Sequence, residues 1–210
     1  MISITGASPP ILSGMLLDAE FAPLLAGFSL NTLESDAATI VGVWPDGRIG
    51  YLNPAYRAFA EAAGAGELCV RWGLGANVFA SIPEPLRRFY VELFGRARAS
   101  SAPLTHLYEC PTPELARTYA LRMHSLSGGR GLLTSHSLVV ARPHPESHAA
   151  DSHEYRDADG ILLQCMHCRR VRRASEEVRW DLVPEYVAKV PPRTSHGLCE
   201  LCLEYHHGVD

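Results

Sequence analysis

Lysine is almost absent from the 210-residue chain, with Lys189 alone against 18 arginines, and no basic residue precedes Arg48. A secretory signal peptide needs a basic start before its apolar run, so the sequence predicts no signal peptide. The apolar N-terminal stretch is interrupted by Asp18, Glu20 and Pro23, too early to span a bilayer. We therefore expect a cytoplasmic protein without a membrane anchor.

The sequence also lacks an excess of charge and a recognisable catalytic motif. Its formal net charge is −4 at pH 7, so no overall positive field attracts nucleic acid or anionic lipid. It contains no phosphate-binding glycine loop, no Gly-x-Ser-x-Gly elbow and no kinase signature. The apolar content of 47% is enough to build a core. We expect a globular protein that is not an enzyme.

Six cysteines are present, and four of them form two C-x-x-C pairs, Cys165 with Cys168 and Cys199 with Cys202. Because cytosol keeps thiols reduced, such pairs are more typical of metal binding than of disulfides. A C-x-x-C turn presents two thiolates to one ion, and two such turns complete the tetrahedral four-cysteine set of structural zinc. The sequence predicts one structural zinc ion in a module spanning 159–210, with bound metal contributing much of its folding free energy.

Other metal chemistries fit these pairs less well. Neither pair is followed by histidine, since Arg169 and Leu203 stand there, which excludes covalent c-type haem. The spacing differs from common iron–sulfur runs, and the tail lacks the βαβ context of a thioredoxin-like pair. His196 lies three residues before Cys199, and we expect it to hydrogen-bond a thiolate, with replacement of a metal ligand as the alternative. His167, inside the first turn, is expected to face solvent.

Residues 31–143 have the pattern of one α+β domain. An Asp46-Gly47 turn joins the first two predicted strands, and Asn53-Pro54 is typical of a helix start. The predicted elements are strands at 39–44, 49–52, 103–110, 116–126 and 131–141, and helices beginning at 54 and spanning 85–100. This order predicts a five-stranded antiparallel sheet with helices on one face.

The segments on either side of this domain differ in character. Residues 1–30 carry apolar residues on one helical face, and Pro23 is expected to kink or split that helix. Such a stripe must be buried, either in its own domain or against a second copy. Residues 144–158 are polar and lack apolar periodicity, which predicts a linker.

The order of strand, Asp-Gly turn, strand and then YLNPAYRAF resembles the opening of a PAS sensory domain, and the later helix and three strands complete it. This resemblance implies a curved sheet around a small-molecule pocket, with homodimers often formed through an N-terminal helix, here 9–28. The tail resembles a Cys-rich segment appended to bacterial sensory proteins, which implies metal binding in a signalling context. Its matching residues are Cys165, Cys168, Trp180, Tyr186, Ser195, His196, Gly197, Cys199 and Cys202.

Several aromatic residues are candidates for the walls of a PAS-type pocket, although core packing is the more frequent role of such residues. They are Trp44, Tyr56, Phe59, Phe79, Phe89 and Tyr119. Haem-binding relatives place a ligating histidine in the long helix, but residues 85–100 contain none. His106, His124 and His136 in the later strands remain as haem ligands, and the cysteine run of flavin photoreceptors is missing. The sequence leaves the pocket's ligand open.

We expect a bacterial signalling protein in which the PAS-like domain senses and the zinc module provides signal output or contact with a partner protein. One alternative is a zinc-containing transcription or nucleic-acid-binding factor that uses the arginines at 169, 170, 172 and 173. Residues 159–210 carry seven Lys or Arg against eight Asp or Glu, and this net charge of −1 disfavours nucleic acid. The other alternative is a haem- or thiol-based redox or gas sensor.

Overall fold

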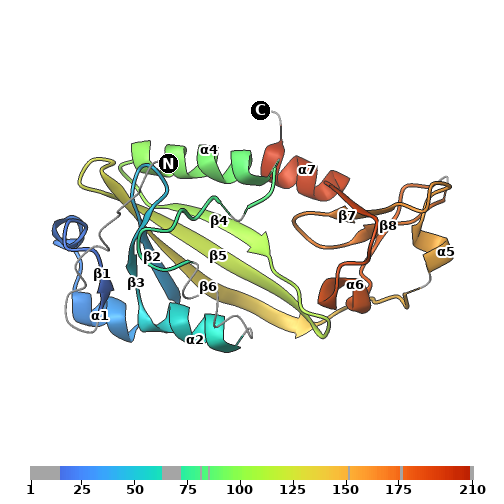
Figure 1. Ribbon diagram of the computed structural model, residues 1–210, viewed down its shortest axis with the longest axis horizontal. Coiled ribbons are helices and arrows are strands. Elements are labelled where there is room, and N and C mark those ends of the chain that lie inside the picture. Colours follow the sequence, from blue (N-terminus) through green and yellow to red (C-terminus); the bar gives the residue numbers. More distant parts are fainter. Residues whose placement is uncertain are drawn as a thin grey trace, which may run out of the picture. The chain divides into compact units, whose positions relative to one another are not determined.

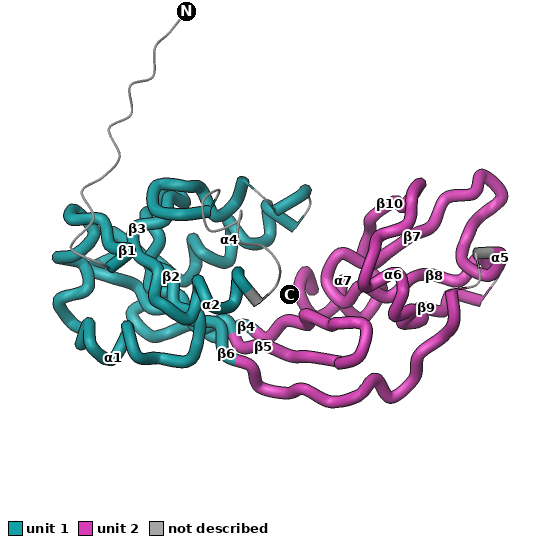
Figure 2. Tube along the Cα trace, turned by 60° about the horizontal axis from the view of Figure 1, so that its bottom comes forward, with its two compact units in different colours: residues 1–106, 121–137 teal, residues 107–120, 138–210 magenta. Residues whose placement is uncertain are grey.

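The structure is a computed structural model, and it describes residues 15–62, 72–80, 82–84, 86–150, 152–175 and 177–208. The chain divides into two compact units, Met1–His106 with Leu121–Ser137, and Leu107–Ala120 with Leu138–Asp210 (Figure 2). Among the helices in these described ranges, none is long and apolar enough to cross a membrane.

The first sheet has six strands in the order β1-β3-β2-β6-β5-β4 (Figure 1). The strands are β1 (Leu16–Leu17), β2 (Thr39–Val43), β3 (Ile49–Leu52), β4 (Leu104–Glu109), β5 (Leu115–Leu126) and β6 (Gly131–Pro143). The accompanying helices are α1 (Leu30–Ser35), α2 (Pro54–Ala62) and α4 (Leu86–Ala99). The α+β prediction is confirmed with all five expected strands, and β1 is a sixth that the sequence did not predict.

Side chains on β2 alternate between two apolar layers, as a strand buried on both faces requires. Ile40 joins the layer that the N-terminal segment 15–33 forms with the sheet. Val41 joins the opposite layer, where Tyr56 of α2 and Phe94 of α4 pack. The two main helices therefore cover one face, and the N-terminal segment covers the other.

The N-terminal segment is not the helix that its apolar stripe predicts. Its described part forms β1, a turn and a short 3-10 helix, η1 (Ala22–Leu25). The Asp18 side chain accepts a 2.8 Å hydrogen bond from the Glu20 backbone N–H, which stabilises the turn. Pro23 then stands in the first turn of η1, where its missing N–H costs nothing.

The prediction of a dimer-forming helix at 9–28 is therefore wrong for residues 15–28. Residues 1–14 lie outside the described part of the chain. The apolar side chains of this segment are used within their own unit, since Phe21 has no exposed surface and Leu25 is 1% exposed. The sequence predicts a homodimer that forms through this helix. Over residues 15–28 the structure contains no such helix, so the predicted dimer contact is absent from these residues.

The ring of Phe21 lies on glycines of three neighbouring strands. A Cβ atom at Gly42 of β2 or Gly50 of β3 would lie 2.4 Å from a Phe21 ring carbon, and one at Gly131 of β6 would lie 3.2 Å away. Trp44 meets the same ring edge to face, with the ring centroids 4.9 Å apart. The absence of side chains at these glycines creates the space that holds the N-terminal segment against the sheet.

We expect Gly42→Ala to destabilise the protein by about 1–3 kcal/mol, because the added methyl group would overpack against the Phe21 ring. Gly95→Ala on α4 is the matched control, since a Cβ there meets nothing within 4 Å. Alanine improves helix propensity, so this control is expected to gain up to about 1 kcal/mol. Urea unfolding measures both changes, and a Gly42→Ala variant as stable as the wild type would contradict the described position of Phe21.

The second unit contains a separate four-stranded sheet in the order β10-β7-β8-β9. Its strands are β7 (Leu162–Cys165), β8 (Val171–Arg172), β9 (Trp180–Asp181) and β10 (Thr194–Gly197), and its helices are α5 (Ser152–Tyr155), α6 (Pro184–Ala188) and α7 (Glu200–His207). β10 runs parallel to β7, whereas β7–β8 and β8–β9 are antiparallel. A small apolar core joins these elements, made of Tyr155, Leu162, Val171, Val183 and Tyr186.

Residues 144–158, the segment predicted to be a linker, belong to this second unit and make contacts within it. The His148 backbone N–H donates a 2.9 Å hydrogen bond to the Leu182 carbonyl. Tyr155 is 1% exposed, and its hydroxyl donates to the Asp181 carboxylate at 3.0 Å. One buried aromatic ring within a polar run leaves no periodicity in the sequence, so composition alone did not reveal it.

Asp181 is a buried carboxylate at the centre of a polar network. It accepts hydrogen bonds from Arg173 and Arg179 as well as from Tyr155, and His148 Nε2 lies 3.5 Å from its Oδ1. Burial alone would raise the pKa of the Asp181 carboxyl, but these hydrogen bonds outweigh burial and hold the pKa below its ordinary value. The network therefore stabilises the charged form of a carboxylate that bridges α5 and β9.

We expect Asp181→Asn to destabilise the second unit by about 1–3 kcal/mol, because the amide loses charge-assisted hydrogen bonds from two partly exposed arginines. The carboxylate's contribution exists above its unfolded pKa, near 3.8, and is lost as the pH falls through its lower folded value. The difference in free energy of unfolding between the wild type and the variant should therefore become smaller at acidic pH. Amide hydrogen exchange in β7 measures the effect, with the exposed Asp159→Asn as control, and equal protection in both variants would contradict it.

Candidate metal centre

The first C-x-x-C pair lies in the turn between β7 and β8. Cys165 ends β7, and its backbone N–H donates to the Arg170 carbonyl at 2.8 Å. The Arg169 N–H donates to the Cys165 carbonyl at 3.1 Å, and Arg169 has a φ of 65°, a left-handed conformation that reverses the chain. This tight reversal lets Cys165 and Cys168 direct their sulfur atoms to the same side.

The second pair begins α7. Cys199 occupies the N-cap position with extended backbone, and Cys202 follows in the first helical turn. Residues three apart on a helix lie on one face, so both sulfurs project together. The Cys199 backbone N–H also donates to Cys165 Sγ at 3.4 Å, a contact that stabilises negative charge on that sulfur.

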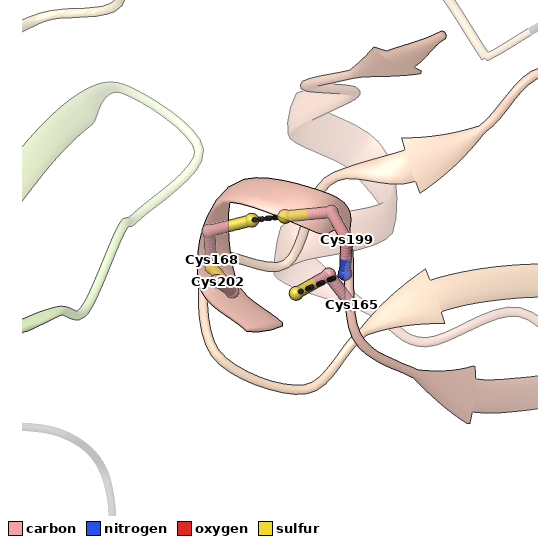
Figure 3. A group of neighbouring side chains, drawn as sticks. All are labelled: Cys165, Cys168, Cys199 and Cys202. Carbon is pink, nitrogen blue, oxygen red and sulfur yellow. Dashed lines mark hydrogen bonds between the residues drawn. The ribbon is translucent and has the colours of Figure 1, made fainter. Parts of the chain in front are cut away.

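The structure brings all four predicted cysteines together (Figure 3). Their sulfur atoms lie within 4.8 Å of one another, and Cys168 Sγ is 3.7 Å from Cys199 Sγ. Tetrahedral thiolates at a Zn–S distance of about 2.3 Å have sulfurs about 3.8 Å apart, so the set fits a zinc ion. All four side chains are buried, and four thiolates leave no open coordination position, which is typical of a structural rather than a catalytic site.

The four thiols influence one another's ionisation. Hydrogen bonds from Cys168 and then from the other two cysteines hold the pKa of Cys165 far below its usual value. The Cys165 sulfur raises the pKa of Cys199, but hydrogen bonds from its other neighbours outweigh this and lower that pKa to about 7. The hydrogen bond to Cys165 raises the pKa of both Cys168 and Cys202. Without metal the cluster therefore retains protons, and a divalent cation would displace them.

Arg170 places a positive charge beside this cluster. Its guanidinium donates to Glu109 Oε2 at 3.1 Å, and it also interacts with the Cys168 sulfur. Burial alone would lower the pKa of Arg170, but the Cys168 sulfur and the Glu109 carboxylate raise it further. Arg170 therefore remains charged and offsets part of the net negative charge that four thiolates and a divalent ion carry. No pattern in the sequence indicated Glu109 as its partner, because the two residues are far apart in the chain.

Two histidines near the cluster have different environments. His196 lies exposed on β10, and the group of four sulfurs does not include it, so its assigned role stays a prediction. His167, expected to face solvent, is only 6% exposed, and its ring stacks on that of His206 with centroids 3.7 Å apart. The expectation for His167 is wrong because the last turn of α7 covers the C-x-x-C turn.

Of the six aromatic pocket candidates, Tyr56 and Phe79 both lie near Phe94 of α4, and the others have different neighbours. Five of them have described apolar or aromatic neighbours: Trp44 with Phe21, Tyr56 with the Val41 layer, Phe79 with Phe94, Phe89 with His106, and Tyr119 with Tyr108. Phe59 on α2 is 49% exposed. Their role in binding a ligand stays a prediction.

The three strand histidines considered as haem ligands are also dispersed. His106 contacts Phe89 of α4, whereas His124 contacts Phe28 of the N-terminal segment on the other side of the sheet. Burial lowers the pKa of both and lowers that of His136 to about 4. His106 and His124, on opposite sides of the sheet, would not hold one haem iron together.

No protein-family model matches the chain, and no curated protein matches it. Solved structures are similar at low identity. The photoactive yellow protein domain of the sensor histidine kinase Ppr from Rhodospirillum centenum matches at 11% identity over 54% of this chain and 95% of that one, with a TM-score of 0.37. The PAS domain of an HTR-like protein from Haloarcula marismortui matches at 15% identity over 51% and 91%, with a TM-score of 0.33.

An RNA-binding light-oxygen-voltage receptor matches at 21% identity, over 62% of this chain and 37% of that chain, with a TM-score of 0.36. Similarities at this level carry no argument about activity or ligand. The α+β fold described above rests on the strand order and the helices of this chain itself.

We expect Cys202→Ser to abolish stoichiometric zinc binding and to unfold the surroundings of α7, because a hydroxyl is a poor replacement for a thiolate ligand. Cys110→Ser is the matched control, since Cys110 is a free thiol outside the cluster. Zinc binding is measured as metal content after purification without added metal. Amide hydrogen exchange of α7 measures whether its surroundings are folded. One zinc per chain in Cys202→Ser, at wild-type protection, would contradict the assignment.

Proposed function

We propose that this chain is a cytoplasmic sensory protein without enzymatic activity, in which a PAS-like domain is coupled to a structural zinc module that contacts a partner protein. The observation that carries the proposal is the link from Glu109, the last residue of β4, through Arg170 to the metal ligand Cys168. A change at the end of that strand would reach the zinc module through this link.

The Glu109–Arg170 ion pair suits a switch better than a structural support. Both side chains are partly exposed, at 46% and 36%, and pairs of this kind contribute about 0–1 kcal/mol to stability. An interaction of that size can be exchanged for another at little cost. For signalling, a ligand or partner must bind the two arrangements with different affinity.

The closed set of four cysteines supports a non-enzymatic role. With four thiolates as ligands, a bound zinc ion would have no position for a water molecule or substrate. Burial of the four sulfurs, from 0% to 9% exposed, also disfavours the thiol-based redox alternative, because oxidants reach exposed thiolates most readily.

The nucleic-acid alternative loses support from the arginines that suggested it. Arg170 pairs with Glu109, and Arg173 pairs with Asp181 and Glu154, so two of the four cluster charges are balanced within the unit. Backbone phosphates attract proteins through uncompensated positive charge. We therefore favour a protein partner.

The coupling is testable by hydrogen–deuterium exchange of zinc-loaded and chelator-treated protein. We expect zinc removal to raise exchange in the module and also in the β4–β5 peptides spanning 107–120, because the Arg170 link loses its anchor. In Glu109→Gln, the exchange of those strand peptides should no longer depend on zinc.

Glu146→Gln serves as the control, since Glu146 is an exposed carboxylate of the same unit. It should retain the zinc dependence of the strand peptides. If zinc removal changes exchange only within 159–210 in the wild-type protein, the module is not coupled to the sheet and the proposal fails.

A further inference from the structure

The last turn of α7 carries a second group of metal-ligand side chains beside the cysteine cluster. His206 and His207 end this helix, and both face His167 of the C-x-x-C turn. The Nε2 atoms of His167 and His207 lie 3.3 Å apart. The His167 ring is nearly parallel to that of His206, with an interplanar angle of 9°.

We propose that His167 and His207 bind a second, exchangeable divalent transition-metal ion, separate from the ion of the four cysteines. Two imidazole nitrogens on one tetrahedral zinc ion, at Zn–N distances of about 2.0–2.1 Å, lie about 3.4 Å apart. The observed separation matches that value. Without metal, the two rings share an N–H···N hydrogen bond at this distance, which requires different tautomers, and a bound ion would displace its proton.

The surroundings hold one ligand in place before the metal arrives. His167 is buried, and its ring is stacked on the His206 ring. Its backbone is fixed by the C-x-x-C turn. His206 is thus a positioning residue that orients the His167 plane, while His207 supplies the second nitrogen from the helix end. A metal-binding side chain that is already held in place loses little conformational entropy when the metal binds.

The local electrostatics favour a cation at this place. Carbonyl groups at the C-terminal end of a helix carry partial negative charge, equivalent to about half an elementary charge. Four thiolates around a divalent ion add a formal charge of −2 nearby. Imidazole ligands suit zinc, copper and nickel, whereas calcium and magnesium prefer oxygen. Two protein nitrogens leave positions for water, so this ion would exchange more readily than the first.

The test is calorimetric titration of zinc into full-length protein that already contains one zinc per chain. We expect the wild type to bind a second equivalent. His207→Ala should weaken that step by roughly tenfold or more, because even residues that merely support metal ligands contribute 10- to 100-fold to affinity. Retention of the first zinc and an unchanged unfolding temperature would show that this variant is folded.

Two further variants make the outcome specific. His206→Phe keeps the stacked ring but removes its nitrogens, so it should retain the second zinc, and His153→Ala on α5 should bind as the wild type does. A wild type that binds only one equivalent in excess zinc overturns the proposal, as does a His207→Ala variant that binds the second equivalent as tightly. Neither result depends on the proposed signalling role.

Discussion

The convergence of four cysteine sulfurs is the constraint on which the second unit depends. It fixes the β7–β8 turn, which carries Cys165 and Cys168, to the start of α7, which carries Cys199 and Cys202. The apolar core beside it is small, and Tyr155 and Tyr186 are its largest members. A core of this size contributes little net stability, so bound metal would supply much of the free energy that holds α7 in place.

The first unit is stabilised in a different way, by burial on both faces of its sheet. The N-terminal segment packs Phe21 on glycines 42, 50 and 131, and α2 and α4 cover the opposite layer. Asn53 is hydrogen-bonded to the backbone at the start of β2. It is fully buried, its Oδ1 accepts from the Ile40 backbone N–H at 2.9 Å, and its Nδ2 donates to the Ala38 carbonyl at 2.9 Å. The sequence predicts Asn53 to be a helix N-cap. Its side chain therefore also fixes the backbone at the start of β2.

The features that the sequence revealed are those encoded locally. Alternating and 3.6-residue patterns located β2 to β6 and both main helices, and the C-x-x-C spacing located the cluster. The features that it hid depend on partners far away in the chain. The stripe of the N-terminal segment was compatible with a helix until the glycine surface that receives Phe21 was known. Arg170 and Glu109 are sixty-one residues apart, and no short-range pattern joins them.

Helix α7 explains why the two candidate metal sites use different ligands. Cys199 and Cys202 stand at its N-terminal end, where unpaired backbone N–H groups and the positive end of the helix dipole stabilise thiolates. His206 and His207 stand at its C-terminal end, where the carbonyl groups favour a bound cation but would not stabilise an anionic sulfur. The two ends of this short helix therefore carry different kinds of metal-binding side chain. The N-terminal end carries soft anionic sulfur, and the C-terminal end carries neutral imidazole. Because the first site is closed and the proposed second site is open, an ion at the cysteines would determine whether α7 is folded, and an ion at the histidines would adjust how firmly its last turn is held against His167.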